Sequence, residues 1–169
     1  YGSVAGVSFD WKGLRLPGGI LAEHRINRFL IENLSPAGYA VAGDFDRLPV
    51  RFRAIAGDLA TGDPVVLAKG DLARAVRASM SIPLVFPPVP WEGRNLVDGL
   101  IVNNLPIDVA KELGGAVLVA VDIGSPRLEP DDYVSALGVA SQVSDLLMRR
   151  RQLDFAAEAD VLVRPDLGD

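Results

Sequence analysis

The chain has 169 residues, a formal net charge of −5 and no cysteine, and these features exclude several classes of protein. Without cysteine the chain can hold no disulfide framework, zinc–thiolate site or cysteine nucleophile, and a single histidine argues against a metal centre built from several imidazoles. A negative net charge has the wrong sign for binding a nucleic-acid backbone, whereas 49% hydrophobic residues supply ample material for an ordered core. We therefore expect a folded domain without metal or other cofactor that does not bind nucleic acid.

A helix and a hairpin are predicted in the first half of the chain. Apolar residues at helical spacing predict a helix over residues 20–33. We expect it to end at residues 35–38, where serine, proline and glycine follow one another. Residues 51–56 alternate between charged and apolar side chains, and an apolar stretch follows at residues 65–67 after a turn sequence. This pattern predicts a β-hairpin.

A second helix, an irregular segment and a strand are predicted next. Asp71 is suited to cap a helix that runs to Ser79. Residues 81–90 contain four prolines, each of which lacks a backbone donor and fixes φ, so that we expect a stiff, irregular connection there. A tight turn at residues 91–94 then leads into a strand at residues 95–97.

The last part of the chain predicts two more helices and two more strands. Pro106 opens a helix that ends near two glycines at residues 114 and 115. Residues 116–123 form an apolar run typical of a buried parallel strand, and residues 132–151 have the spacing of a long helix. A final strand is predicted at residues 161–163. Strands that alternate with helices indicate the α/β class with a layered sheet.

Asp98 is the residue to which the local pattern assigns chemistry. It follows an apolar strand, stands before a glycine, and is followed by two asparagines at residues 103 and 104. An acid at the carboxyl end of a strand lies where α/β folds place their active sites, and a partly desolvated carboxylate can accept a proton from a hydroxyl nucleophile. From this pattern alone, the favoured interpretation is a turn aspartate that satisfies loose backbone N–H groups, because such turn acids are common.

Several ordered segments of the chain resemble the patatin-like phospholipase family. Asp98-Gly99 and the following residues 102–106 look like the Asp-Gly-Gly/Ala motif of that family, and residues 77–89 resemble the segment that leads into the motif in bacterial members. Further similarity lies in an earlier helix, the hairpin and the last strand, at residues 13–34, 52–62 and 159–165. We therefore interpret residues 1–169 as one partial domain of this family, with the resemblance strongest over residues 13–169.

The resemblance implies a serine acyl hydrolase with a three-layer α/β/α fold and a mainly parallel sheet, incomplete at its N-terminal side. Members use a Ser–Asp dyad without histidine, in which the serine lies on a Gly-x-Ser-x-Gly turn, a Gly-rich loop supplies the oxyanion hole, and the aspartate takes the serine proton. Asp98 matches the dyad aspartate. The implied substrates are acyl esters of phospholipid or lysophospholipid, reached through transient contact with a membrane surface. Similar bacterial proteins are cytoplasmic or attached to the outer membrane, and the chain does not distinguish these locations.

The chain departs from the family pattern because no Gly-x-Ser-x-Gly occurs in it. In the family this turn and the oxyanion loop precede the segment that opens here, and the chain begins without methionine. We therefore expect the nucleophile in an upstream segment of a longer protein, and this chain alone to be inactive. Smaller departures are Leu100, where the motif usually has glycine or alanine, and Leu84, where glycine is common. The alternative is a catalytically inactive patatin-like remnant that acts as a lipid-binding or interaction module.

The other candidate residues are interpreted as structural. His24 lies on the expected first helix opposite its apolar stripe, which predicts a solvated side chain, and the implied dyad needs no histidine. The paired acids lack the glycine and glutamate spacing of a calcium loop, and single tryptophans are more often packed in a fold than used as membrane anchors. These residues are Asp44 with Asp46, Asp131 with Asp132, Trp11, and Trp91.

Overall fold

The computed structural model describes residues 23–83, 85–123 and 158–165, together with the backbone of three short strands near the start. These three strands pair antiparallel in the order β1-β2-β3, with bounds Ser3–Val4, Val7–Asp10 and Gly13–Arg15. The predicted long helix at residues 132–151 lies outside the described residues, as do Trp11, Asp131 and Asp132.

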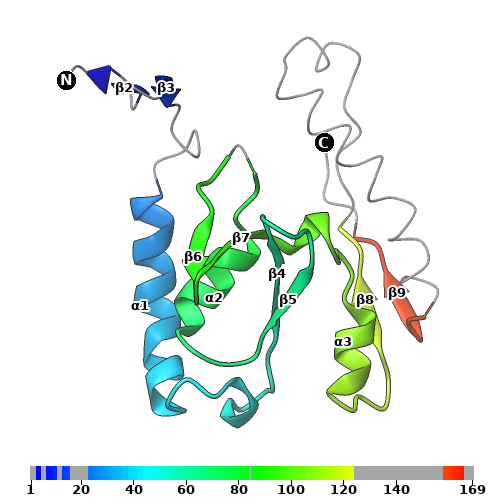
Figure 1. Cartoon of the computed structure of the whole chain (residues 1–169). Helices are drawn as coiled ribbons and strands as arrows, with labels where there is room; N and C mark the ends of the chain where they lie inside the picture. Colours follow the sequence, from blue (N-terminus) through cyan, green and yellow to red (C-terminus); the bar gives the residue numbers. More distant parts are fainter. Residues whose placement is uncertain are drawn as a thin grey trace.

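The centre of the described structure is a four-stranded sheet with strand order β5-β4-β7-β6 (Figure 1). Its strands are β4 (Ala54–Asp58), β5 (Pro64–Leu67), β6 (Val89–Trp91) and β7 (Arg94–Asp98). The β4–β5 hairpin and the strand before Asp98 confirm the sequence prediction. The predicted irregular segment 81–90 is too long by two residues, because Val89 and Pro90 belong to strand β6.

Every pairing in this sheet is antiparallel, whereas the sequence predicted a mainly parallel sheet between two helical layers. Short connections account for two of the three pairings: β6 and β7 are joined by Glu92 and Gly93 alone, both with positive φ, and β4 and β5 are joined by five residues. A two-residue turn of this kind permits only antiparallel strands, while parallel strands need a long crossover. Among the described strands only β8 (Val119–Val121) and β9 (Val161–Val163) pair in parallel. The α/β class holds, and the described part is antiparallel at its centre.

Two helices cover one side of this sheet. Helix α2 (Leu72–Ser79) packs against β4, β6 and β7, and helix α1 (His24–Ala40) packs against α2 (Figure 1). Asp71 caps α2 as predicted, because its carboxylate accepts a hydrogen bond from the backbone N–H of Arg74. The main core lies between α2 and the sheet, and its buried residues are Phe45, Ala54, Ala56, Leu67, Leu72, Ala75, Ala78, Val89 and Leu96.

Helix α1 is longer than the sequence indicated. The predicted stop at residues 35–38 is wrong, since the helix continues through Pro36 to Ala40. Gly38 is buried on the side that meets α2, where an added Cβ would lie 3.2 Å from the Cβ of Leu72. The helix therefore brings a residue without a side chain to its closest contact with α2, and this packing outweighs the local helix-breaking tendency of proline and glycine.

Beyond β7 the chain forms a 3₁₀ turn and a second, smaller packing unit. The turn spans Gly99–Ile101, and helix α3 (Ile107–Glu112) begins after Pro106 as predicted. Leu105, Ile107 and Ala120 form the buried core of this unit. The predicted strand at residues 116–123 is confirmed over Val119–Val121, but Val119 and Val121 are exposed and only Ala120 is buried. None of the helices in the described part of the chain has the length and apolar character needed to cross a membrane.

The central strand β7 offers a direct test of this core. Leu96 is fully buried in the core between α2 and the sheet, whereas Leu59, just after β4, is 55% exposed. We expect Leu96→Ala to lower the free energy of unfolding of the complete protein by about 2–5 kcal/mol, and Leu59→Ala to change it by less than about 0.5 kcal/mol. Urea unfolding measures both values. Equal effects of the two substitutions would contradict the assigned core.

Candidate active site

Asp98 is the last residue of β7, and β-sheet pairing fixes its backbone on one side. It stands opposite Ala56 of β4, and its own N–H donates to the backbone carbonyl of Ser81 at 2.9 Å. Its carboxylate oxygen Oδ1 accepts a hydrogen bond from the N–H of Leu100 at 2.8 Å and caps the following 3₁₀ turn. The side chain therefore does satisfy a turn N–H, as the structural interpretation of the sequence expected. This contact uses only one of its two oxygens.

The surroundings of Asp98 favour the protonated carboxyl group. Burial raises its pKa above the ordinary value of 3.8, and the hydrogen bond from Leu100 lowers it by a smaller amount. A carboxylate with a raised pKa holds a proton more strongly, which improves its action as a general base. Asp98 is thus both fixed in position and electrostatically suited to accept a proton.

Gly99 allows the backbone at Asp98 to approach β4 closely. An added Cβ at Gly99 would lie 2.4 Å from the carbonyl oxygen of Ile55, far below any normal contact. Its φ is not in the left-handed region, so that the glycine is required for space.

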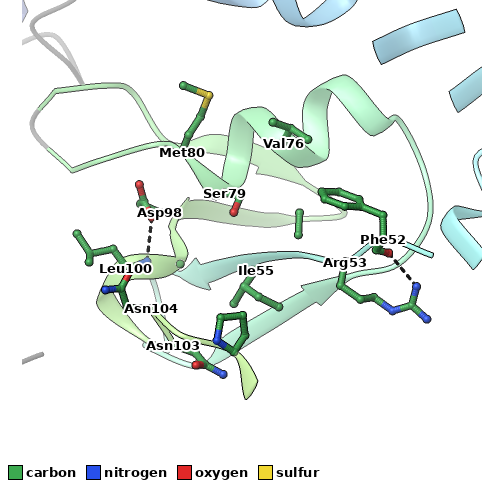
Figure 2. A pocket seen from close by; sticks show the side chains of 13 residues that line it. Phe52, Arg53, Ile55, Val76, Ser79, Met80, Asp98, Leu100, Asn103 and Asn104 are labelled. Carbon is green, nitrogen blue, oxygen red and sulfur yellow. Dashed lines mark hydrogen bonds between the residues drawn. The ribbon is translucent and has the colours of Figure 1, made fainter. Parts of the chain in front are cut away.

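Asp98 opens into a hollow of about 330 Å³ between α2, β4 and the segment that follows β7 (Figure 2). Much of its wall is apolar, from Phe52, Ile55, Val76, Met80 and Leu100. Val76 of α2 is half-buried and lines this hollow. A carboxylate at the rim of an apolar hollow can act on a polar bond of a substrate whose apolar part fills the space.

Ser79 lines the same hollow, yet its position does not match a nucleophile on a strand-to-helix turn. It is the last residue of α2, and the described contacts include no hydrogen bond between its hydroxyl and Asp98. Asn103 also lines the hollow and is buried, with its Nδ2 donating to Oδ1 of Asp108 at 2.9 Å. The Oδ1 of Asn103 has no hydrogen-bond partner among the described residues. Asn104 also borders the hollow and is exposed.

A buried arginine near Asp98 was missed by the sequence interpretation. Arg77 is 4% exposed and donates hydrogen bonds to Ser81, Asn27 and Glu23. Its position in α2, four residues after the buried Ala73, places it on the apolar stripe of the helix. That periodicity is a signal by which the sequence could have identified a buried cation.

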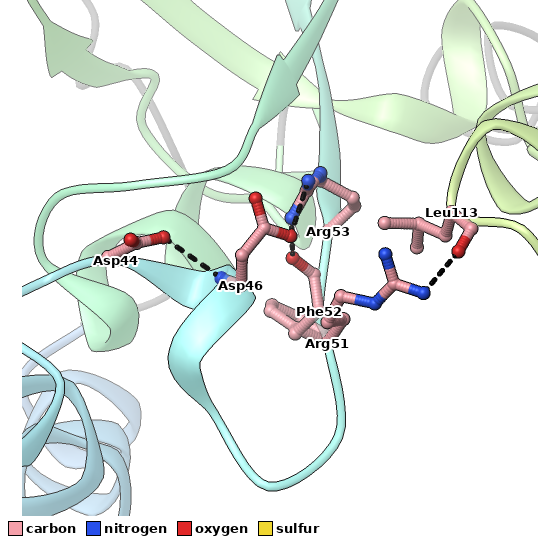
Figure 3. Close-up of polar contacts among 6 residues, drawn as sticks. All are labelled: Asp44, Asp46, Arg51, Phe52, Arg53 and Leu113. Carbon is pink, nitrogen blue, oxygen red and sulfur yellow. Dashed lines mark hydrogen bonds and ion pairs between the residues drawn. The ribbon is translucent and has the colours of Figure 1, made fainter.

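The remaining candidate residues are structural where the structure describes them. His24 is the exposed first residue of α1, as expected. Asp44 accepts a hydrogen bond from the N–H of Asp46, and Asp46 forms an ion pair with Arg53 at 2.7 Å (Figure 3). Trp91 is half-buried and packs against the core and under Arg74. Within the described residues no three His, Cys, Asp or Glu side chains form a group that could hold a metal ion.

Comparisons with known proteins give a consistent result. The sequence model of the patatin-like phospholipase family matches residues 4–111, which contain the Asp98 hollow. Patatin-like phospholipase domain-containing protein 7 of Mus musculus is 45% identical over 88 residues, covering 50% of this chain and 6% of that protein. A putative patatin-like phospholipase domain-containing protein of Caenorhabditis elegans is 35% identical over 108 residues, covering 63% of this chain and 9% of that protein.

An uncharacterized NTE family protein of Mycobacterium tuberculosis is 38% identical over 78 residues, covering 46% of this chain and 13% of that protein. The chain therefore spans only 6% to 13% of the length of these relatives. The matches include animal as well as bacterial proteins and do not single out a bacterial origin. The family match ends at residue 111, so that the similarity of the last strand to the family stays a prediction.

The close approach of Gly99 to β4 generates one prediction. We expect Gly99→Ala to lower the free energy of unfolding of the complete protein by about 1–3 kcal/mol, because the new methyl group meets a backbone carbonyl that cannot rotate away. Gly115→Ala is the matched control, since its added Cβ would have no neighbour nearer than 3.7 Å. Thermal or urea unfolding compares the two. A Gly99→Ala protein as stable as the control would show that the approach to Ile55 is not a constraint.

The raised pKa of Asp98 generates a second prediction. The folded state binds the Asp98 proton more tightly than the unfolded state, whose carboxyl has the ordinary pKa of 3.8. The stability contributed by this carboxyl is therefore complete below the unfolded pKa and is lost as the pH rises through the folded pKa. Asn at this position keeps an oxygen for the Leu100 N–H and carries no charge to desolvate.

We accordingly expect Asp98→Asn to be more stable than the wild-type protein at neutral pH, with a difference that shrinks toward acid. Urea unfolding of the complete protein, repeated at pH values from neutral down to the ordinary carboxyl pKa of 3.8, measures the difference in the free energy of unfolding. A variant that is less stable at neutral pH, or a difference independent of pH, would contradict the desolvation of Asp98.

Proposed function

This chain belongs to the patatin-like phospholipase family, and from that premise we propose that the protein containing it is a lipid acyl hydrolase that cleaves acyl esters of phospholipids or lysophospholipids. The observation that carries this proposal is the Asp98 carboxylate, held at the end of β7 beside an apolar hollow with its pKa raised by burial. A proton acceptor next to an apolar space suits a substrate in which a long acyl chain is attached through an ester bond.

In the proposed reaction Asp98 acts as the general base of a Ser–Asp dyad. The carboxylate takes the proton of a serine hydroxyl while the serine oxygen attacks the ester carbonyl carbon and forms a tetrahedral oxyanion. The oxyanion collapses to an acyl-serine, and the proton on Asp98 passes to the departing alcohol. Asp98 then takes a proton from water, whose oxygen attacks the acyl-serine and forms a second tetrahedral oxyanion. When this oxyanion collapses, the bond to the serine oxygen breaks, the proton on Asp98 passes to that oxygen, and the fatty acid is released with the serine and Asp98 restored.

The serine and the oxyanion hole are proposed to come from sequence outside residues 1–169. No Gly-x-Ser-x-Gly occurs in this chain, and Ser79 lies at the end of a helix instead of on a turn after a strand. The only histidine, His24, is exposed on α1 and does not line the Asp98 hollow. Asp98 lines that hollow, and we propose it as the base.

The proposal extends to the complete protein in two respects. Phospholipids reside in bilayers, so we include a transient contact with a membrane surface. We also include the three-layer fold with a mainly parallel sheet, to which the parallel pair β8–β9 would belong.

The direct test removes the charge of Asp98 and keeps its shape. We expect Asp98→Asn in the complete protein to lower the rate of hydrolysis of a short nitrophenyl ester by roughly a hundred- to ten-thousandfold, because the serine then has no base. Asp98→Ala should be at least as impaired. Asp63→Asn, which changes an exposed acid in the β4–β5 turn, should hydrolyse the ester at the wild-type rate.

Hydrolysis by Asp98→Asn near the wild-type rate would contradict the role of Asp98. A complete protein that carries the nucleophile turn but shows no esterase activity would favour the lipid-binding or interaction module instead.

A further inference from the structure

We propose that Arg77 and Ser81 form a positioning pair that holds the backbone of Asp98 in place. This inference deepens the proposed function, since it rests on Asp98 as the base of that reaction. Neither residue lines the Asp98 hollow, so that neither is a catalytic residue. Both act through the backbone carbonyl of Ser81, which accepts a hydrogen bond from the backbone N–H of Asp98 at 2.9 Å.

The contact with Ser81 matters because Asp98 has few other restraints. On the β4 side its backbone is paired with Ala56, and its carboxylate is held by the N–H of Leu100 alone among the described hydrogen bonds. The Ser81 carbonyl supplies the restraint on the opposite side. A shift of this carbonyl would move the end of β7 and with it the carboxylate, and a misplacement of about 1 Å in an active site can cost roughly a hundredfold in rate.

Ser81 is itself held by two side-chain hydrogen bonds to a single residue. It is fully buried, its hydroxyl donates to the backbone carbonyl of Arg77 at 2.7 Å, and the same hydroxyl accepts from Nη1 of Arg77 at 2.6 Å. Its backbone N–H donates to the carbonyl of Ala78 at 3.1 Å. These hydrogen bonds hold Ser81 against the C-terminal end of α2, and the backbone carbonyl of Ser81 accepts the hydrogen bond from the N–H of Asp98.

Arg77 anchors this arrangement to the rest of the fold. Its Nε donates to Oδ1 of Asn27 at 3.0 Å and its Nη2 to Oε2 of Glu23 at 2.8 Å, both next to or within α1. The guanidinium also lies over the ring of Phe86, with its central carbon 4.6 Å from the ring centroid. One side chain thus connects α1, the end of α2 and the segment before β6.

The geometry requires an arginine. Its three nitrogens point to three separate acceptors, a fixed fork that the single ammonium of lysine cannot reproduce. The ion pair with Glu23, whose side chain is partly exposed, offsets the cost of burying the Arg77 charge, and the three hydrogen bonds fix the orientation of the guanidinium. This is the behaviour expected of a positioning device.

The test measures the Asp98 restraint separately from hydrolysis. In the complete protein, we expect Ser81→Ala to accelerate hydrogen exchange of the Asp98 amide by roughly tenfold, the effect of weakening one buried hydrogen bond. Exchange of the Leu59 amide, which donates to Asn95 in the same sheet, should stay unchanged. In ester hydrolysis kcat should fall roughly ten- to a hundredfold with little change in KM, and Ser81→Thr, which keeps the hydroxyl, should restore part of it.

Arg77→Lys provides a second variant that keeps the charge and loses the fork, and it should behave like Ser81→Ala. Arg74→Ala is the matched control: Arg74 lies on the same helix, is exposed, and contacts Pro90 and Trp91 instead. It should leave both the Asp98 amide exchange and kcat unchanged.

Unchanged Asp98 amide exchange in Ser81→Ala would overturn the positioning pair, as would equal acceleration at Asp98 and Leu59, which marks general destabilisation. Selective acceleration at Asp98 without any loss of kcat would support the structural restraint and contradict Asp98 as the base. The failure of the inference and the failure of the proposed function are therefore distinguishable.

Discussion

The antiparallel pairing of β4 with β7 is the constraint on which the rest of the structure depends. It sets Asp98 opposite Ala56 and brings Gly99 against the carbonyl of Ile55, where no side chain fits. Leu96 and Val97 just before Asp98 point to opposite faces of the sheet and are both almost completely buried, so a slide of β7 by one residue would displace packed side chains on both faces. Core packing therefore fixes the register of β7, and the polar contacts of Asp98 set the position of its end within that register.

Arg77 and Asp98 both carry charged side chains near the end of β7, but their surroundings differ. Arg77 is buried with its guanidinium nitrogens hydrogen-bonded and its charge paired with Glu23. Asp98 is partly buried with a single described hydrogen bond to its carboxylate, and its pKa is raised. A fully satisfied charge is stable and unreactive, whereas an under-compensated one gains by taking up a proton. The fold thus places a hydrogen-bonded, ion-paired cation and a carboxylate with a raised pKa within one small region.

Local sequence signals predicted the elements whose causes are local. The β4–β5 hairpin follows from its turn sequence, the start of α2 from the Asp71 cap, and the start of α3 from Pro106. In each of these cases the deciding interaction lies within a few residues along the chain. The structure places Asp98 at the end of a strand as predicted, while its role as the base stays a prediction.

Features that depend on distant contacts were not predicted. Helix α1 continues through Pro36 because Gly38 packs against Leu72, and these two residues are 34 positions apart in the sequence. The space requirement of Gly99 is set by Ile55 on another strand, and the burial of Arg77 is set by Glu23 and Asn27 next to or within α1. The spacing within α2 places Arg77 on the apolar stripe, but the partners that make its burial favourable lie elsewhere in the sequence and cannot be read from the helix pattern.

The central claim is that Asp98 activates a serine that lies outside residues 1–169. The most direct measurement is the rate and site of labelling of the complete protein by a fluorophosphonate, which reacts with an activated serine hydroxyl. The account predicts one labelled serine outside this chain, identified by peptide mass spectrometry, and a labelling rate that falls sharply in Asp98→Asn. Labelling of Ser79 or Ser81, or a rate unaffected by Asp98→Asn, would contradict it.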